Sequence, residues 1–219
     1  MMSDAKQIIR SVVHGVFVLV SACALGPVET SAPRTYFLNP EISWKNPRPS
    51  GERIGAALLL ITQPRAQAGF DTALMAYLLR PYEVNYYAYN QWADTPARLL
   101  HRLMVESLDK SGLWRAVLQT PSAIQVQYRL DCDNLILEQQ FFSRPSRVRL
   151  ALRAQLIETK TQTILATRYF EFFEAAETDD AYGGVQAANH AAAKLINQLI
   201  AWAHTTMEDP SNRASGHVQ

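Results

Sequence analysis

Cysteine, excess charge and long apolar runs are all scarce in this sequence. Its 219 residues contain 2 cysteines, and 21 Lys and Arg oppose 20 Asp and Glu, for a formal net charge of +1. Such a chain has no overall field that would attract nucleic acid or an acidic membrane surface. Beyond the N-terminus, no run approaches the roughly 20 apolar residues of a membrane-spanning helix. Hydrophobic residues at 48% and charged residues at 19% indicate a globular domain with a sizeable core.

Signatures of catalysis and of metal binding are also missing. The sequence has no GxSxG, HExxH or GxxxxGK motif. The histidines are scattered, and three of them are expected on solvated helix faces: His101, His190 and His204. Asp131 and Asp133 stand beside Asn134, where such residues commonly form turns, so a turn is favoured over a metal pair. We therefore expect a protein that is not an enzyme and that has no metal and no cofactor other than covalent lipid.

The N-terminus has the parts of an export signal. A basic segment, MMSDAKQIIR, precedes the nearly uncharged SVVHGVFVLVSA, and small residues follow. Val20-Ser21-Ala22-Cys23 resembles the bacterial lipobox. The resemblance implies cleavage between Ala22 and Cys23, a diacylglyceryl group on the Cys23 thiol and acylation of the new amine. The alternative is an ordinary secretory signal whose cleavage site lies nearby.

Lipidation at Cys23 would divide the chain into four parts. We expect residues 1–22 to be a signal peptide and residues 23–34 to be the lipidated N-terminus and a flexible tether. Residues 35–207 would form a single domain, and residues 208–219 a disordered tail. Two or three acyl chains hold a protein firmly at a membrane, whereas one gives marginal attachment.

Period-two alternation predicts several strands. In AIQVQYRLDCD the apolar positions share one face, which places Cys132 in the core as a small hydrophobic side chain rather than a nucleophile. The polar DCDN suits a hairpin turn before a further strand, NLILEQQFFS. SRVRLALRAQLIE also alternates, with Arg147, Arg149 and Arg153 on one face. That row predicts a solvated outer face or a face for an acidic partner, and is unlike a nucleic-acid platform in a near-neutral exported chain.

Two helices and more strands complete the pattern. Thr95 can cap a helix that starts at Pro96 and ends near Gly112, and DDAYGGVQAANHAAAKLINQLIAWAHTTM has the apolar stripe of a second helix. RTYFLN and IGAALLLIT are expected strands, and two more flank Arg80-Pro81. The expected fold is α+β: an antiparallel or mixed sheet with both main helices packed on one face.

The block LLRPYEVNYYAYNQWADTPARLLHRLMVESLDKSGLWRAV resembles the ABC-type transport auxiliary lipoproteins, of the paraquat-inducible protein C type. The positions that fit are Arg80, Tyr86, Trp92, Ala93, Asp94, Pro96, Leu99, Leu100, Ser111, Gly112 and Val117, with Trp114 where Phe is usual. The resemblance implies a non-enzymatic periplasmic lipoprotein that accompanies an MCE-domain protein and its ABC transporter in lipid, specifically phospholipid, transport. By analogy with lipoprotein sorting in enteric bacteria, Ala24 permits transfer to the outer membrane.

A docking surface for the transport conduit is the physical role that we assign to this block. Its candidate residues are Arg80, Tyr86, Trp92, Asp94 and Pro96. The alternative for the Trp92–Pro96 turn is a structural corner between a strand and a helix. The alternative for the whole protein is a structural or assembly lipoprotein of the outer membrane without a role in lipid traffic. The oligomeric state stays open, and partners built as symmetric rings would favour self-association.

Overall fold

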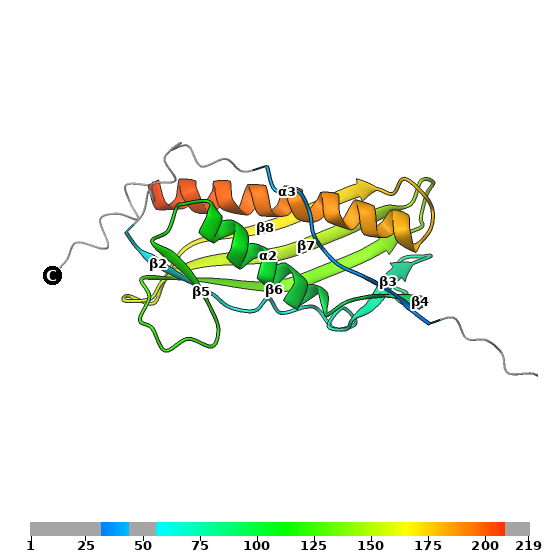
Figure 1. Cartoon of the computed structure of the whole chain (residues 1–219). Coiled ribbons are helices and arrows are strands. Elements are labelled where there is room, and N and C mark those ends of the chain that lie inside the picture. The colour runs from blue at the N-terminus through cyan, green and yellow to red at the C-terminus, as the bar shows by residue number, and fades with distance from the viewer. Residues whose placement is uncertain (1–31, 44–55, 209–219) are drawn as a thin grey trace, which may run out of the picture. The chain divides into compact units, whose positions relative to one another are not determined.

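The computed structural model describes residues 32–43 and 56–208, which belong almost entirely to one compact unit that starts at Pro33 (Figure 1). The elements follow the order β1 (Arg34–Tyr36), β2 (Leu58–Ile61), β3 (Leu74–Leu78), β4 (Asn85–Trp92), α2 (Pro96–Lys110), β5 (Ala116–Gln119), β6 (Tyr128–Gln140), β7 (Arg147–Glu158), β8 (Thr163–Ala175) and α3 (Ala181–Glu208). The predicted signal peptide, the lipidated Cys23 and nearly all of the tether lie outside the described residues. The predicted tail does too, apart from Glu208, the last residue of α3.

One mixed sheet contains the eight strands of the described residues. β6, β7 and β8 are antiparallel neighbours. The other edge of the long β6 is shared by two short parallel strands, with β2 along its first residues and β3 along its last. β5 flanks β2, while β4 and then β1 flank β3. The expected α+β class is confirmed, in its mixed-sheet form.

Both helices cover the same face of this sheet (Figure 1), as expected. The hydroxyl of Thr95 accepts a hydrogen bond from the backbone N–H of Arg98, so α2 starts where its sequence predicts. The layer between helices and sheet is apolar: Leu100 and Met104 of α2, Leu150 of β7 and Leu195 of α3 are all 0% exposed. Burial of this layer provides the main stabilisation of the domain.

The predicted turn at DCDN is wrong, because β6 runs through it without interruption. The two strands expected on either side are one 13-residue strand, and residues 123–127 precede it as a loop. Its register against β7 shifts between Asp133 and Ile136, and Asn134 has a φ of 54°. A bulge with Asn in the left-handed region therefore absorbs the polar residues that suggested a turn.

A strap, residues 37–43, crosses α3 outside the sheet. The backbone N–H of Asn39 donates to Oδ1 of Asn189 at 2.6 Å, and Nδ2 of Asn197 donates to Oγ of Ser43 at 3.1 Å. Leu38 anchors the strap in the core, where it is 0% exposed. This contact fixes the start of the described chain against the last helix.

Candidate functional site

The turn from β4 to α2 is a closed corner. The indole of Trp92 is only 4% exposed and belongs to the main core, and Pro96 is buried as well. Asp94 Oδ1 accepts a hydrogen bond from the backbone N–H of Thr95 at 2.7 Å and lies 3.5 Å from Nη1 of Arg98. Of the three predicted docking residues in this turn, Asp94 is the one that a partner could reach without unfolding.

The other two predicted docking residues belong to the opposite end of β4. Arg80 lies in the turn between β3 and β4, where it forms an ion pair with Glu83 and lowers the pKa of that carboxyl. The hydroxyl of Tyr86 donates to the carbonyl oxygen of Gly69 at 2.8 Å. Because β4 is eight residues long, Arg80 and the Trp92 corner do not form one continuous surface.

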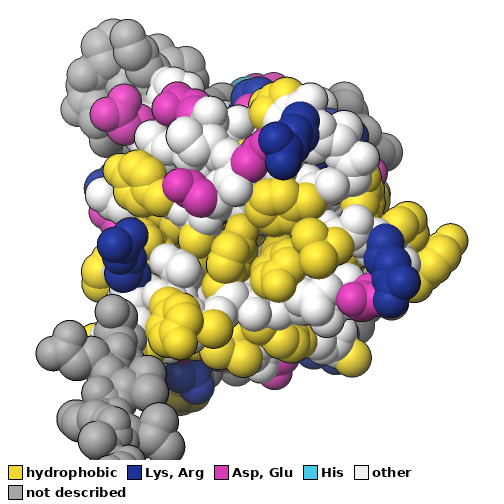
Figure 2. Space-filling view, turned by 90° about the vertical axis from the view of Figure 1, so that its right-hand side faces the viewer, with side chains coloured by type: hydrophobic (Ala, Val, Ile, Leu, Met, Phe, Trp, Pro, Cys, Tyr) yellow, Lys and Arg dark blue, Asp and Glu magenta, His cyan; other side chains and the backbone are white. Residues whose placement is uncertain are grey.

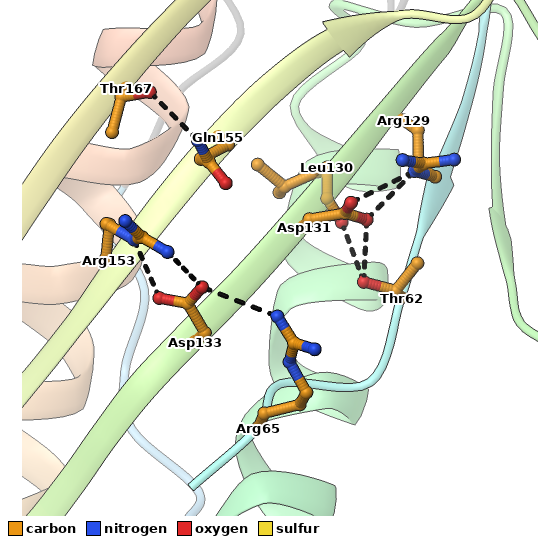
Figure 3. A network of polar contacts seen from close by, with 9 residues as sticks. All are labelled: Thr62, Arg65, Arg129, Leu130, Asp131, Asp133, Arg153, Gln155 and Thr167. Atoms are coloured by element: carbon orange, nitrogen blue, oxygen red, sulfur yellow. Dashed lines mark hydrogen bonds and ion pairs between the residues drawn. The ribbon is translucent and has the colours of Figure 1, made fainter. Parts of the chain in front are cut away.

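Asp131 and Asp133 lie in the middle of a polar network on the sheet face away from the helices (Figure 3). Asp133 Oδ1 accepts from Nε of Arg153 at 2.8 Å, and Oδ2 is 3.6 Å from Nη2 of Arg65. Asp131 Oδ1 accepts from Nε of Arg129 at 3.0 Å and from Thr62 Oγ1 at 3.0 Å. The hydrogen bond from Arg153 is the main cause of a lowered Asp133 pKa. Both carboxylates are therefore paired with guanidinium groups.

The predicted arginine row is on the expected outer face, and two of its three charges are paired with carboxylates of the sheet. Nε of Arg149 donates to Glu171 Oε1 at 2.8 Å, and its Nη1 lies 3.6 Å from the buried Glu138. Arg153 pairs with Asp133, and the guanidinium of Arg147 lies 4.3 Å from the centre of the Phe173 ring. Carboxylates therefore neutralise Arg149 and Arg153, which leaves an acidic partner little beyond Arg147 to attract it.

Cys132 and the helix histidines can be placed directly. The Cys132 side chain is 3% exposed in the core, as expected, and burial raises the pKa of its thiol. The prediction of a solvated His101 is wrong, because its ring is 9% exposed and Nε2 lies 3.1 Å from the carbonyl oxygen of Ile61. His101 falls on the face of α2 that packs toward β2. His190 is exposed, and Nδ1 of His204 lies 3.3 Å from Glu208.

Two hollows stand out on the surface of the described residues. One of about 660 Å³ is bordered by Tyr128, Glu158 and Lys160. Another of about 530 Å³ lies between the strap and α3, beside Tyr182 and Asn189. Across residues 32–43 and 56–208, no three His, Cys, Asp or Glu side chains are grouped as metal ligands would be. Neither described helix is long and apolar enough to span a membrane.

An exposed apolar surface at one end of the sheet was missed by the sequence analysis. We define the tip as the β3–β4 turn, residues 79–84, and the β6–β7 loop, residues 141–146. Figure 2 looks at this end of the domain and shows hydrophobic side chains gathered across it. The exposed fractions are 58% for Leu79, 104% for Tyr82 and 43% for Phe142. The available signal was a turn, LLRPYEV, with apolar residues where turns are normally polar.

Comparison with known proteins establishes the family. A match to the family "ABC-type transport auxiliary lipoprotein component" extends over residues 36–200. The chain therefore belongs to this family of auxiliary lipoproteins of ABC-type transport, which confirms the resemblance seen in the sequence. A search of curated proteins gave no match.

Solved structures share the fold at low sequence identity. Protein XCC0632 from Xanthomonas campestris is 21% identical, with a TM-score of 0.70 over 81% of this chain and 98% of that chain. An uncharacterized protein is 12% identical, with a TM-score of 0.59 over 79% and 99% of the two chains. Protein CT253 from Chlamydia trachomatis is 5% identical, with a TM-score of 0.50 over 70% and 99%. At these identities the similarity concerns the fold alone.

Proposed function

We propose that the mature protein is a non-enzymatic auxiliary component of an MCE-type ABC system that transports phospholipid. Acyl chains on Cys23 hold it at the periplasmic face of the outer membrane, and its folded domain contacts the MCE-domain protein. The family match over residues 36–200 is the observation that carries this proposal. The lipobox-like Val20-Ser21-Ala22-Cys23 supplies the chemistry of attachment.

The contribution of such a protein is its position. A domain confined near a membrane meets a partner at the same membrane at a high effective concentration, without any additional contact. The buried Cys132 and the arginine-paired Asp131 and Asp133 are all engaged in structural contacts. Their structural roles are consistent with a domain that binds a partner rather than one that catalyses a reaction.

Partner docking is assigned to exposed parts of the predicted block. Asp94, Arg80 and Tyr86 present side-chain atoms to solvent, whereas Trp92 and Pro96 support the corner from inside. The exposed residues lie at two ends of β4. A partner that contacts both ends must therefore extend along this strand.

Metabolic labelling with a fatty acid tests the anchor. We expect label on the wild-type protein and none on Cys23→Ser, with the labelled protein in the outer-membrane fraction. Cys132→Ala is the matched control for loss of a cysteine, and it should keep the label because its thiol is buried in the core. An unlabelled wild-type protein that is free in the periplasm would contradict the proposal.

Affinity capture tests the partner. The acylated wild-type protein should retain the MCE-domain protein, and Arg80→Ala combined with Asp94→Ala should weaken that capture by more than the loss of folded protein, measured by thermal unfolding, accounts for. Capture of outer-membrane assembly proteins with no MCE-domain protein would favour the alternative of a lipoprotein without a role in lipid traffic.

A further inference from the structure

The two loops of the tip are held side by side by contacts between the strands that precede them. β3 and β6 are parallel and end side by side, with Leu78 opposite Gln140. The backbone N–H of Phe141 donates to the Leu78 carbonyl at 2.9 Å, and the rings of Tyr77 and Phe141 pack edge to face with centroids 6.0 Å apart. The two loops that follow these strands therefore lie next to each other and display Leu79, Tyr82 and Phe142 from one rigid base.

Tyr82 combines an exposed aromatic ring with an unusual backbone conformation. Its side chain is 104% exposed, and its backbone has a φ of 69°, which a bulky side chain rarely adopts. A polar residue or a glycine would suit such a turn better. The sequence instead places an aromatic ring at the most exposed point, on a strained backbone, which indicates a contact outside the domain.

The charges at the tip are balanced. Arg80 pairs with Glu83, and Nε of Arg144 lies 3.8 Å from Asp179, which also accepts a hydrogen bond from the backbone N–H of Ser146. Electrostatic attraction therefore adds little to the binding of an acidic or a basic partner at the tip. Apolar and aromatic side chains mixed with arginine are instead typical of the boundary between lipid headgroups and acyl chains.

The direction of β1 shows from which side the chain enters the folded domain. β1 runs parallel to β4, with Arg34 opposite Asn90, and β4 starts at the tip with Asn85. The chain therefore enters β1 from the side of the tip. Because the register of β4 against β3 shifts, Asn85 and Gln91 lie opposite Tyr77 and Leu74, so Arg34 is no more than about 10 Å along the sheet from the start of β4 at roughly 3.3 Å per residue. The covalent path of about eleven residues from Cys23 to Arg34 can reach up to about 36–40 Å. That length allows Cys23 to lie beyond the tip on the same side.

We propose that the tip rests on the bilayer that holds the anchor, with Leu79, Tyr82 and Phe142 inserted at the boundary between headgroups and acyl chains. This inference rests on the proposed lipidation of Cys23. The contact fixes the orientation of the domain. Arg80 then lies at the level of the headgroups, where a partner at the membrane surface can still reach it and extend along β4 to Asp94, and the opposite end of β6 and β7 faces away from the membrane. Since the two arginines of the tip pair with Glu83 and with the neighbouring Asp179, contact requires no anionic lipid.

Fluorescence quenching by labelled lipids tests this contact. Full-length Tyr82→Cys and Ile124→Cys proteins are produced in cells that process the lipoprotein, labelled with an environment-sensitive dye and reconstituted in phosphatidylcholine vesicles with brominated acyl chains. Ile124 is the matched control, because it is an apolar residue, 57% exposed, in the loop at the opposite end of β6. Mass spectrometry verifies acylation and single labelling, and flotation verifies attachment to the vesicles.

The proposal predicts a blue shift and strong quenching for the dye at Tyr82→Cys, and a dye in water at Ile124→Cys. Adding Leu79→Asp and Phe142→Asp should abolish the shift while the protein still floats and unfolds at an unchanged temperature. A floated, acylated protein with equal signals at both positions would overturn the contact while leaving the anchor intact. So would a dye at Tyr82→Cys that leaves water only when the MCE-domain protein is added. A protein that does not float overturns the anchor and this contact together.

Discussion

Trp92 joins the sheet to the first long helix from inside the core. Its indole is 4% exposed, and its backbone N–H donates to the Ala73 carbonyl at 2.8 Å. The residue ends β4, and the buried Pro96 opens α2 four positions later. A large side chain in this position acts on stability first and on any surface contact only through the fold.

Truncation of Trp92 should therefore destabilise the domain. We expect Trp92→Ala to lower the free energy of unfolding by about 3–5 kcal/mol, with a smaller loss for Trp92→Phe. Denaturant titration measures this change, and capture of the MCE-domain protein should fall only with the folded fraction. Loss of capture by a fully folded variant would show that Trp92 contacts the partner itself.

Cys132 should be chemically silent in the folded protein. Because its thiol is 3% exposed and burial raises its pKa, alkylating reagents at mildly alkaline pH should leave it unmodified. Modification should become fast once denaturant unfolds the domain, which mass spectrometry can follow over time. Fast modification of the native protein at Cys132 would contradict its place in the core.

At the scale of elements, Asp133 links β6 to β7. Its carboxylate accepts hydrogen bonds from Arg153, and these lower its pKa in the folded protein. A lowered carboxyl pKa stabilises the fold above the ordinary pKa of Asp, near 4, and the contribution is lost as the pH falls through the lowered value. Acid should therefore weaken this pair while the apolar layer on the other face stays packed.

Replacement of Asp133 tests this link. We expect Asp133→Asn to lower the free energy of unfolding by about 1.5–3 kcal/mol at pH 7. The difference from the wild type should begin to shrink below about pH 4, where Asp133 of the unfolded chain takes up a proton, and it should be lost as the pH falls through the lowered pKa of the folded protein. Urea titrations at pH 7 and at acid pH measure both values. A difference that is constant with pH would assign the effect to packing rather than to charge.

α3 approaches the sheet closely at Gly184. A Cβ added there would collide with Oε1 of Gln139, whose amide is fixed by Tyr87, Ser146 and the carbonyl of Asp180. We expect Gly184→Ala to destabilise the domain by about 1–3 kcal/mol, although alanine favours helices elsewhere. Ala201→Gly, at an exposed position of the same helix, should cost about 0.5–1 kcal/mol. Thermal unfolding compares the two, and a stabilised Gly184→Ala would contradict the close approach.

Local signals account for the parts of the fold that the sequence predicts. Thr95, Pro96 and Gly112 delimit α2 within one stretch of chain, and strict alternation marks β7. The bulge at Asn134 was not predictable, because a polar tetrapeptide looks the same in a turn and in a continuous strand. The ion-pair partners of the neighbouring Asp133, Arg153 and Arg65, are distant in sequence.

The candidate surfaces were harder to predict for a similar reason. The block from Arg80 to Pro96 is continuous in sequence, yet β4 separates its two ends in space. The strap depends on a pair, Asn39 and Asn189, that is 150 residues apart in the chain. The tip exists only because the turn after β3 and the loop after β6 lie side by side. Sequence patterns identify single helices and strands, whereas a surface depends on which of these elements lie next to each other in the fold.

At the scale of the whole molecule, the proposed function depends on attachment to a membrane. The chain belongs to a family of auxiliary lipoproteins, and its described domain consists of one sheet, two helices and a strap. The proposed lipid on Cys23 would hold this domain at a membrane, with the apolar tip against the bilayer. The remaining surface would then be presented to the transport partner in one fixed orientation.

Mass spectrometry of the protein purified from native membranes tests this account most directly. The account predicts a mature chain that starts at Cys23, with a diacylglyceryl group on the thiol and an acyl chain on the amine. A mature chain that starts at another residue, or an unmodified thiol on Cys23, would contradict it.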